Sequence, residues 1–145
     1  MLTASGESKL ARRTLEKAYQ LQPTNPDVQK SLTTAYESLL KEKDDHEVRF
    51  NLGRTLYQMG EFDKAIGCFQ RTAQDYRWEA DSAKALGKCF TAKGMLDLAL
   101  QEYKKLVVDE ETKELLYDLA QRYEAKKDLV GAKQVYRQLF AADIS

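Results

Sequence analysis

The sequence predicts an all-α solenoid of about four antiparallel helix hairpins, and three observations lead to this fold class. A Leu-Gly pair at 52–53 returns 34 residues later at 86–87, and a Leu-Ala pair follows at 119–120. Apolar residues recur at intervals of three and four along nearly the whole chain, as they do in amphipathic helices. A repeat of this length cannot bury a core alone, so successive repeats must stack.

The first 45 residues are expected to form an irregular pair of helices. A helix over about 7–22 ends before the first proline of the chain. Asn25 is a favourable N-cap and Pro26 a favourable first residue for a second helix, over about 26–41. The charged stretch 41–45 then interrupts the helical pattern. This pair therefore serves either as a degenerate cap hairpin, which we favour, or as a partial repeat with a break in register.

Six further helices are expected in the rest of the chain, where the apolar period continues. Gly60 and Gly94 end two of them, because glycine adopts the left-handed conformation at a helix C-terminus without a steric penalty. Short connections favour antiparallel neighbours, so consecutive helices should pair. The expected helices span about 46–59, 61–75, 79–93, 95–108, 112–126 and 128–141.

Three sets of residues share one order of small, apolar and aromatic side chains. They are Leu52, Gly53, Leu56, Gly60, Phe62, Ala65 and Phe69; Leu86, Gly87, Phe90, Gly94, Leu96, Ala99 and Tyr103; and Leu119, Ala120, Tyr123, Lys127, Leu129, Ala132 and Tyr136. This pattern resembles the tetratricopeptide repeat (TPR), a helix–turn–helix unit of 34 residues. The resemblance covers about 46–141, and it implies a right-handed superhelical α-solenoid.

The resemblance also divides the chain into four parts. The irregular hairpin occupies 1–45, and TPR-like repeats occupy 46–79, 80–112 and 113–145, the last of them degenerate and expected to be the edge of a fragment. Lys127 replaces the turn glycine of that last repeat, which costs about 1 kcal/mol if the turn demands a positive φ.

Composition argues against several classes of function. The 23 basic and 23 acidic residues balance, and no apolar run is long enough to span a bilayer, so we expect neither nucleic-acid nor membrane partners. Cys68 and Cys89 are too sparse for a disulfide framework, which favours a cytoplasmic setting. His46 is the only histidine, so neither a metal site nor a catalytic set can be assembled around it. We therefore expect no cofactor and no enzymatic activity.

The resemblance implies a binding groove, because TPR first helices turn their second, fifth, ninth and twelfth positions toward a concave surface. The second positions here are acidic: Glu47, Asp81 and Glu114. Aromatic and cationic side chains at the other positions would suit a peptide or protein segment of some acidic character. The alternative is that these side chains are ordinary solvated or packing residues. The expected groove residues are Phe50, Arg54, Tyr57, Lys84, Lys88, Thr91, Tyr117, Gln121 and Glu124.

One known variety of TPR groove is not expected here. Some members of the family bind the C-terminal carboxylate of chaperones with a set of Lys, Asn, Asn, Lys and Arg residues. Asn51 matches one of these positions, but Phe50 and Ala85 occupy others, and Asp118 places a negative charge where a cation is needed.

The last expected helix raises a second hypothesis, because it carries a wide apolar surface that includes Val135, Leu139 and Phe140. Solenoid ends normally need a polar cap. Either further repeats follow in a longer parent chain, or this end meets another copy to form a homo-oligomer. The sequence thus predicts a non-enzymatic scaffold for protein–protein interaction, with self-assembly through the terminal helices as the alternative.

Overall fold

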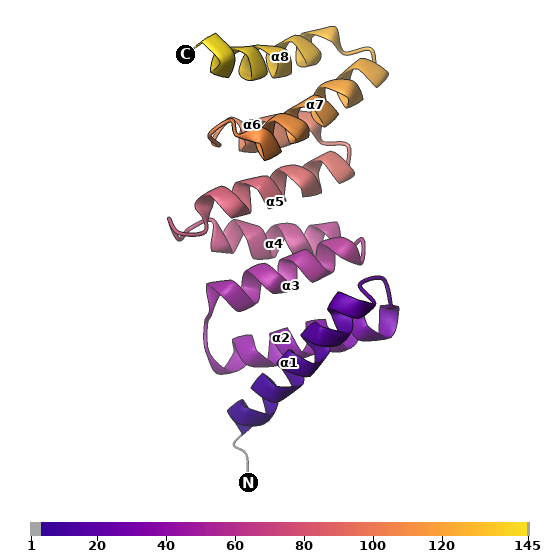
Figure 1. Cartoon of the computed structure of the whole chain (residues 1–145), viewed down its shortest axis with the longest axis vertical. Helices are drawn as coiled ribbons and strands as arrows, with labels where there is room; N and C mark the ends of the chain where they lie inside the picture. The colour runs from indigo at the N-terminus through magenta and orange to yellow at the C-terminus, as the bar shows by residue number, and fades with distance from the viewer. Residues whose placement is uncertain (1–3, 145) are drawn as a thin grey trace. The chain divides into compact units, whose positions relative to one another are not determined.

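The computed structural model describes residues 4–144, which form eight helices and no strand. The prediction of an all-α fold is confirmed. Short turns join successive helices in pairs, as Figure 1 shows within each part of the chain. The helices are α1 (Ala4–Leu21), α2 (Pro26–Glu42), α3 (His46–Gln58), α4 (Phe62–Thr72), α5 (Glu79–Ala92), α6 (Leu96–Tyr103), α7 (Glu110–Ala125) and α8 (Leu129–Ile144).

The chain divides into two compact units, an N-terminal unit (Met1–Trp78) and a C-terminal unit (Glu79–Ser145). In the N-terminal unit α1 packs against α2, α2 against α3, and α3 against α4. In the C-terminal unit α5 pairs with α6 and α7 with α8, while α7 also packs against α6 and α5. Each unit therefore contains two helix hairpins that bury a shared core.

Capping side chains place the starts of three helices. The Asn25 side chain accepts hydrogen bonds from the backbone N–H groups of the first turn of α2, at 2.9 and 3.3 Å. Asp45 caps α3 through the Val48 N–H at 3.2 Å, and Asp109 caps α7 through the Thr112 N–H at 2.8 Å. Because Asp109 satisfies this N–H group, α7 begins at residue 110, two residues before the predicted start.

Three helix–helix turns have the same hydrogen-bond pattern at the end of the first helix. The backbone nitrogen of Glu61 donates to the Leu56 carbonyl, and that of Gly60 to the Tyr57 carbonyl, which is the Schellman arrangement. Gly60 and Gly94 have φ values of 81° and 77°, as predicted for left-handed caps. Lys127 makes the same turn with φ 60°, so the third repeat carries the strain that the sequence indicated.

Two second helices are shorter than the sequence pattern predicts. Helix α4 ends at Thr72 and α6 at Tyr103, whereas helices to 75 and 108 were expected. The backbone after each end makes tighter bonds to the residue three positions earlier, such as Asp75 N to Thr72 O and Leu106 N to Tyr103 O. The apolar period continues through these turns, which is why it does not reveal where the α-helix stops.

A glycine lies opposite an aromatic ring where the two helices of each later hairpin cross. A Cβ atom built on Gly53 would lie 2.7 Å from the ring of Phe69, and one built on Gly87 would overlap the ring of Tyr103. Both rings are buried, so only a residue without a side chain permits this approach. The predicted role of these two glycines is confirmed.

The last hairpin uses the same contact with the two helices exchanged. Ala120 is fully buried on α7, as expected for a small residue at the crossing. The glycine, however, is Gly131 on the second helix α8, and a Cβ there would overlap the ring of Tyr123 on α7. The repeat pattern does not point to Gly131, because the other two repeats carry the aromatic ring on the second helix.

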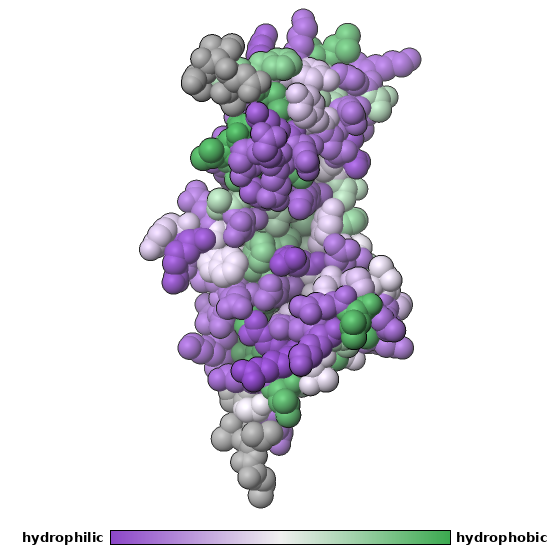
Figure 2. All heavy atoms as spheres, in the orientation of Figure 1, coloured by the Kyte–Doolittle hydropathy of each residue, from purple (hydrophilic) through white to green (hydrophobic). Residues whose placement is uncertain are grey.

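One face of the molecule is largely hydrophilic. Figure 2 shows hydrophilic residues over most of the face in view, with apolar residues in small separate groups. None of the helices within the described part of the chain combines the length and apolar character that crossing a bilayer requires.

We expect Gly53→Ala to lower the free energy of unfolding by about 1–3 kcal/mol, because the new methyl group overlaps a buried ring. Gly67→Ala is the matched control in the same hairpin, since nothing lies within 4 Å of its Cβ position. That change should raise stability by up to about 1 kcal/mol through helix propensity alone. Urea unfolding measures both variants, and equal stabilities would contradict the close-packing account.

Candidate binding surfaces

The N-terminal unit contains a pocket of about 310 Å³ between α1 and α3, with Tyr36 of α2 also lining it. Arg54, a predicted groove residue, lies in this pocket with Asn51 from the same helix. Tyr19 of α1 lines the same pocket. The pocket therefore depends on three helices, of which α1 and α2 lie outside the repeats that the sequence pattern identified.

Charged hydrogen bonds hold α1 in place at this pocket. Arg12 of α1 donates to Glu16 at 2.7 Å and to Glu47 of α3 at 3.2 Å, and its guanidinium lies 5.8 Å from the centre of the Tyr36 ring. The Tyr36 hydroxyl donates to Glu16 at 2.8 Å. These contacts pair both carboxylates with donors from within the unit.

Two predicted groove residues of α3 pack within the N-terminal unit. The ring centre of Phe50 lies 5.2 Å from those of Phe69 and Trp78, and Tyr57 lies 5.4 Å from Phe62. Both side chains are half-buried, which fits the alternative that they are packing residues. The aromatic rings at the pocket are Tyr19 and Tyr36 instead. The repeat pattern missed them because both lie in the first 45 residues, outside the part of the chain that the resemblance covers.

The predicted cations of α5 differ in their surroundings. The Nζ atom of Lys84 lies 3.2 Å from Oε2 of Glu111 and 3.7 Å from Oδ2 of Asp109, the residue that caps the start of α7. Burial lowers the pKa of Lys84, but the hydrogen bond and charges of these carboxylates outweigh that effect and raise it. Lys88 is exposed and has no ion pair among the described residues. Only Lys88 therefore keeps its charge available to a partner.

Thr91 is a correction to the predicted groove. Its side chain is buried, and its hydroxyl donates to the Gly87 carbonyl at 2.7 Å. A threonine hydroxyl in a helix commonly bonds to the carbonyl one turn earlier, and here packing against the neighbouring elements also removes it from solvent. Thr91 is thus part of the interior of the C-terminal unit.

The predicted groove residues of α7 lie next to aromatic side chains of α8. Tyr117, Gln121 and Glu124 are exposed. Glu124 accepts a hydrogen bond of 2.6 Å from the Tyr136 hydroxyl, which raises the pKa of Tyr136. The Tyr136 ring stacks on that of Phe140, with centres 6.0 Å apart. The structure thus joins Glu124, assigned to the groove, with Phe140, assigned to self-association.

Two of the residues assigned to self-association are corrected by their burial. Val135 is 0 % exposed and Leu139 is 2 % exposed, because both point into the core between α7 and α8. Phe140 is 51 % exposed and remains on the surface. The sequence shows an apolar helix but cannot distinguish the face that its own hairpin buries from the face that is left open.

Comparison with known proteins confirms the resemblance. The family model described as "Tetratricopeptide repeat" matches residues 46–76. This part of the chain is therefore similar to a tetratricopeptide repeat. The comparison with curated proteins found no match.

Solved structures of TPR type share the fold over nearly the whole chain. A crystal structure of MamA matches with a TM-score of 0.66 and 16% identity, covering 99% of this chain and 96% of that one. A second MamA structure (AMB-1) matches with a TM-score of 0.64 and 20% sequence identity. The match covers 97% of this chain and 85% of that one. The C-terminal part of a TPR repeat-containing protein from Cytophaga hutchinsonii matches with a TM-score of 0.52 and 19% sequence identity. That match covers 94% of this chain and 60% of the other. At these identities the likeness establishes the TPR fold alone.

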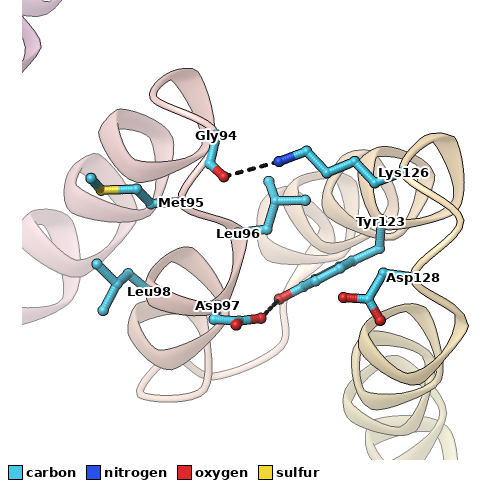
Figure 3. A pocket seen from close by; sticks show the side chains of 8 residues that line it. All are labelled: Gly94, Met95, Leu96, Asp97, Leu98, Tyr123, Lys126 and Asp128. Carbon is cyan, nitrogen blue, oxygen red and sulfur yellow. Dashed lines mark hydrogen bonds between the residues drawn. The ribbon is translucent and has the colours of Figure 1, made fainter.

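A second pocket, of about 320 Å³, lies between the turns of the two hairpins in the C-terminal unit. Figure 3 shows the Tyr123 hydroxyl bonded to Asp97 and the Lys126 ammonium bonded to the Gly94 carbonyl, at 2.6 and 3.1 Å. Both bonds join one helix hairpin of this unit to the next. The polar groups of this pocket therefore serve the packing of the repeats.

The single histidine and the two cysteines have structural surroundings. Cys89 is buried, and Cys68 is half-buried, with burial raising the pKa of its thiol. His46 begins α3, and its Nε2 atom lies 4.0 Å from Asp75. Across the described residues no group of three or more potential ligands is placed to hold a metal ion.

We expect the protein to lose stability as the pH rises above 10. Burial and hydrogen bonds to Glu16 and Asp97 raise the pKa of Tyr36 and Tyr123 above the usual 10.0. The unfolded chain therefore releases these protons at a lower pH than the folded protein, so the free energy of unfolding falls from about pH 10 upward.

Urea unfolding at a series of alkaline pH values measures this slope. The double variant Tyr36→Phe with Tyr123→Phe should flatten it, whereas Tyr76→Phe, at an exposed position, should not. An unchanged slope in the double variant would contradict the proposed role of the two buried hydroxyls.

Proposed function

We propose that this protein is a non-enzymatic scaffold that binds a peptide or protein segment through the first helices of its TPR hairpins. The TPR fold suggests protein–protein interaction, since solenoid repeats present extended surfaces to partners. The cytoplasmic setting stays a prediction.

One observation carries the proposal: the ninth position of each first helix is exposed and unengaged. Arg54, Lys88 and Gln121 occupy this position in α3, α5 and α7. Among the described residues none of their side chains has a hydrogen bond or an ion pair. Most side chains at the other predicted groove positions are buried or already bonded within the chain. These three side chains are therefore available for a ligand.

The charge at these positions favours a partner with acidic residues. Arg54 and Lys88 are cations without carboxylate partners in the described part of the chain, while Lys84 is already engaged by Glu111. A partner carboxylate would therefore gain an ion pair without first displacing one. Tyr117 and Glu124 add an aromatic and an acceptor group to the surface offered by α7.

We expect the double variant Arg54→Glu with Lys88→Glu to weaken binding of an acidic peptide partner by at least about tenfold, because each change replaces attraction with repulsion. The matched control is Lys64→Glu with Lys133→Glu, which alters net charge equally at exposed positions of the second helices. Titration by isothermal calorimetry measures both. Equal affinity of the two variants for every partner would contradict the first-helix surface.

Self-assembly is the second candidate, and the exposed ring of Phe140 stacked on Tyr136 favours it. Light scattering over a concentration series should show a mass that increases with concentration and that Phe140→Asp abolishes. Val107→Asp is the control, since Val107 is also exposed but belongs to the link between α6 and α7 and not to α8. A monomer at every concentration would rule out this alternative.

A further inference from the structure

We propose that the outer face of α8 binds an amphipathic helix of another protein, and that this helix carries an acidic residue between two apolar residues. The outer face is the side of α8 that its own hairpin leaves exposed. It uses none of the first-helix positions Arg54, Lys88 and Gln121, so the inference goes beyond the proposed function.

The outer face of α8 combines apolar and cationic side chains. Leu129 is 67 % exposed and Phe140 is 51 % exposed. Lys133 and Arg137 lie between them and are also exposed, whereas Val135 on the opposite side is buried. Side chains spaced by three or four residues share one side of a helix. The face therefore consists of Leu129, Val130, Lys133, Tyr136, Arg137 and Phe140.

The equivalent side of α6, the second helix of the preceding hairpin, is covered by α7. Leu96 and Leu100 on that side are 6 % and 3 % exposed. Asp97 beside them accepts a hydrogen bond of 2.6 Å from the Tyr123 hydroxyl of α7, as Figure 3 shows. In this unit α7 packs against α6. That side of a second helix is thus a surface on which another helix packs.

The aligned positions of α8 differ from those of α6 in a way that indicates what would cover them. Val130 replaces Asp97, and Lys133 replaces Leu100. A helix packed on α8 would therefore meet an apolar side chain where α7 meets a carboxylate, and an ammonium group where α7 meets a leucine. Covering an ammonium group without a partner is costly, so the incoming helix must supply a carboxylate there.

The cations of this face are available to such a carboxylate. Across residues 4–144, neither Lys133 nor Arg137 has a hydrogen bond or an ion pair with another described residue. They lie one helical turn apart, so both can approach the same acidic side chain of a partner. An acidic residue would therefore gain an attraction without displacing an existing ion pair.

The far end of α8 supplies a second apolar contact. Helix α6 ends at Tyr103, whereas α8 continues to Ile144 and so adds turns that α6 lacks. Phe140 lies in this extension, and its ring stacks on that of Tyr136 with centres 6.0 Å apart. Along α8 the order is thus apolar, cationic, apolar. An amphipathic helix with the order apolar, acidic, apolar complements it.

A second copy of this chain is a poorer match through its other terminal helix. The exposed side of α1 carries Lys9, Arg13 and Lys17. Packing that side on the outer face of α8 would place these cations beside Lys133 and Arg137, and like charges across an interface are unfavourable. The charge of the face therefore favours a different protein with an acidic helix.

The test begins with a library of alanine-rich helical peptides that vary along one side. Selection keeps peptides that bind the full chain and discards those that also bind the Lys133→Glu variant. We expect the remaining peptides to carry Asp or Glu with an apolar residue one turn away on each side. A selected peptide is then labelled with a fluorophore for anisotropy titrations.

A charge exchange tests the central contact. Replacing the acidic residue of the peptide by Lys should weaken binding to the unaltered chain by about fivefold or more, because attraction becomes repulsion. The same peptide should recover affinity on Lys133→Glu, where the two charges are opposite again. That recovery also shows that Lys133→Glu is folded. Lys30→Glu, at an exposed position of α2, is the control and should give no recovery.

The apolar contacts are tested on the acidic peptide. Leu129→Gln and Phe140→Gln should each weaken its binding several-fold, because each removes apolar area from the contact. Leu21→Gln is the matched control, since Leu21 is 83 % exposed but belongs to α1. Circular dichroism of each variant checks that the helices remain folded.

Three results would overturn the inference. One is a selection that yields no peptide, or only peptides without an acidic residue between apolar ones. Another is a charge exchange that recovers no affinity on Lys133→Glu. The third is a dimer, detected by light scattering, that the acidic peptide dissociates, because a second copy would then cover this face. None of these results bears on the first-helix surface of the proposed scaffold.

Discussion

The close contact between a glycine and an aromatic ring at each helix crossing is the constraint on which the later hairpins depend. Gly53 lies under Phe69 and Gly87 under Tyr103, with no space for a Cβ atom in either case. The ring fills the volume that a side chain would otherwise occupy, so the two helix backbones can approach closely. Gly131 and Tyr123 repeat this contact with the helices exchanged, so the geometry matters more than which helix carries the glycine.

Close packing at the crossings also determines which side chains of the first helices remain exposed. One face of each first helix packs against its partner helix, and residues on the opposite face of the same helix stay open to solvent. Arg54, Lys88 and Gln121 are such residues. Lys84 lies on the same kind of face but meets Glu111 at the start of α7, so a neighbouring repeat can withdraw a side chain that the pattern alone would assign to the groove.

The errors in the predicted site have a common physical origin. Repeat positions describe the average environment of a residue, whereas burial depends on the particular neighbours. Thr91 is buried in the unit where α5 packs against α6 and α7, and Leu139 is buried where α7 packs against α8. Phe50 packs against Trp78, which lies after α4 and is the single tryptophan of the chain. The pocket residue Tyr19 was missed because α1 carries no clear repeat signature.

The sequence by itself determined the number and order of the helices, the left-handed turns at Gly60 and Gly94, and the small residues at the crossings. These features depend on local conformation and on short-range periodicity, which a single chain displays directly. Only the tertiary structure decided that α1 joins α3 around Arg54, and that Phe140 is exposed while Leu139 is not. Such outcomes depend on contacts between helices distant in sequence, where the side chains of one helix select which face of another stays open to solvent.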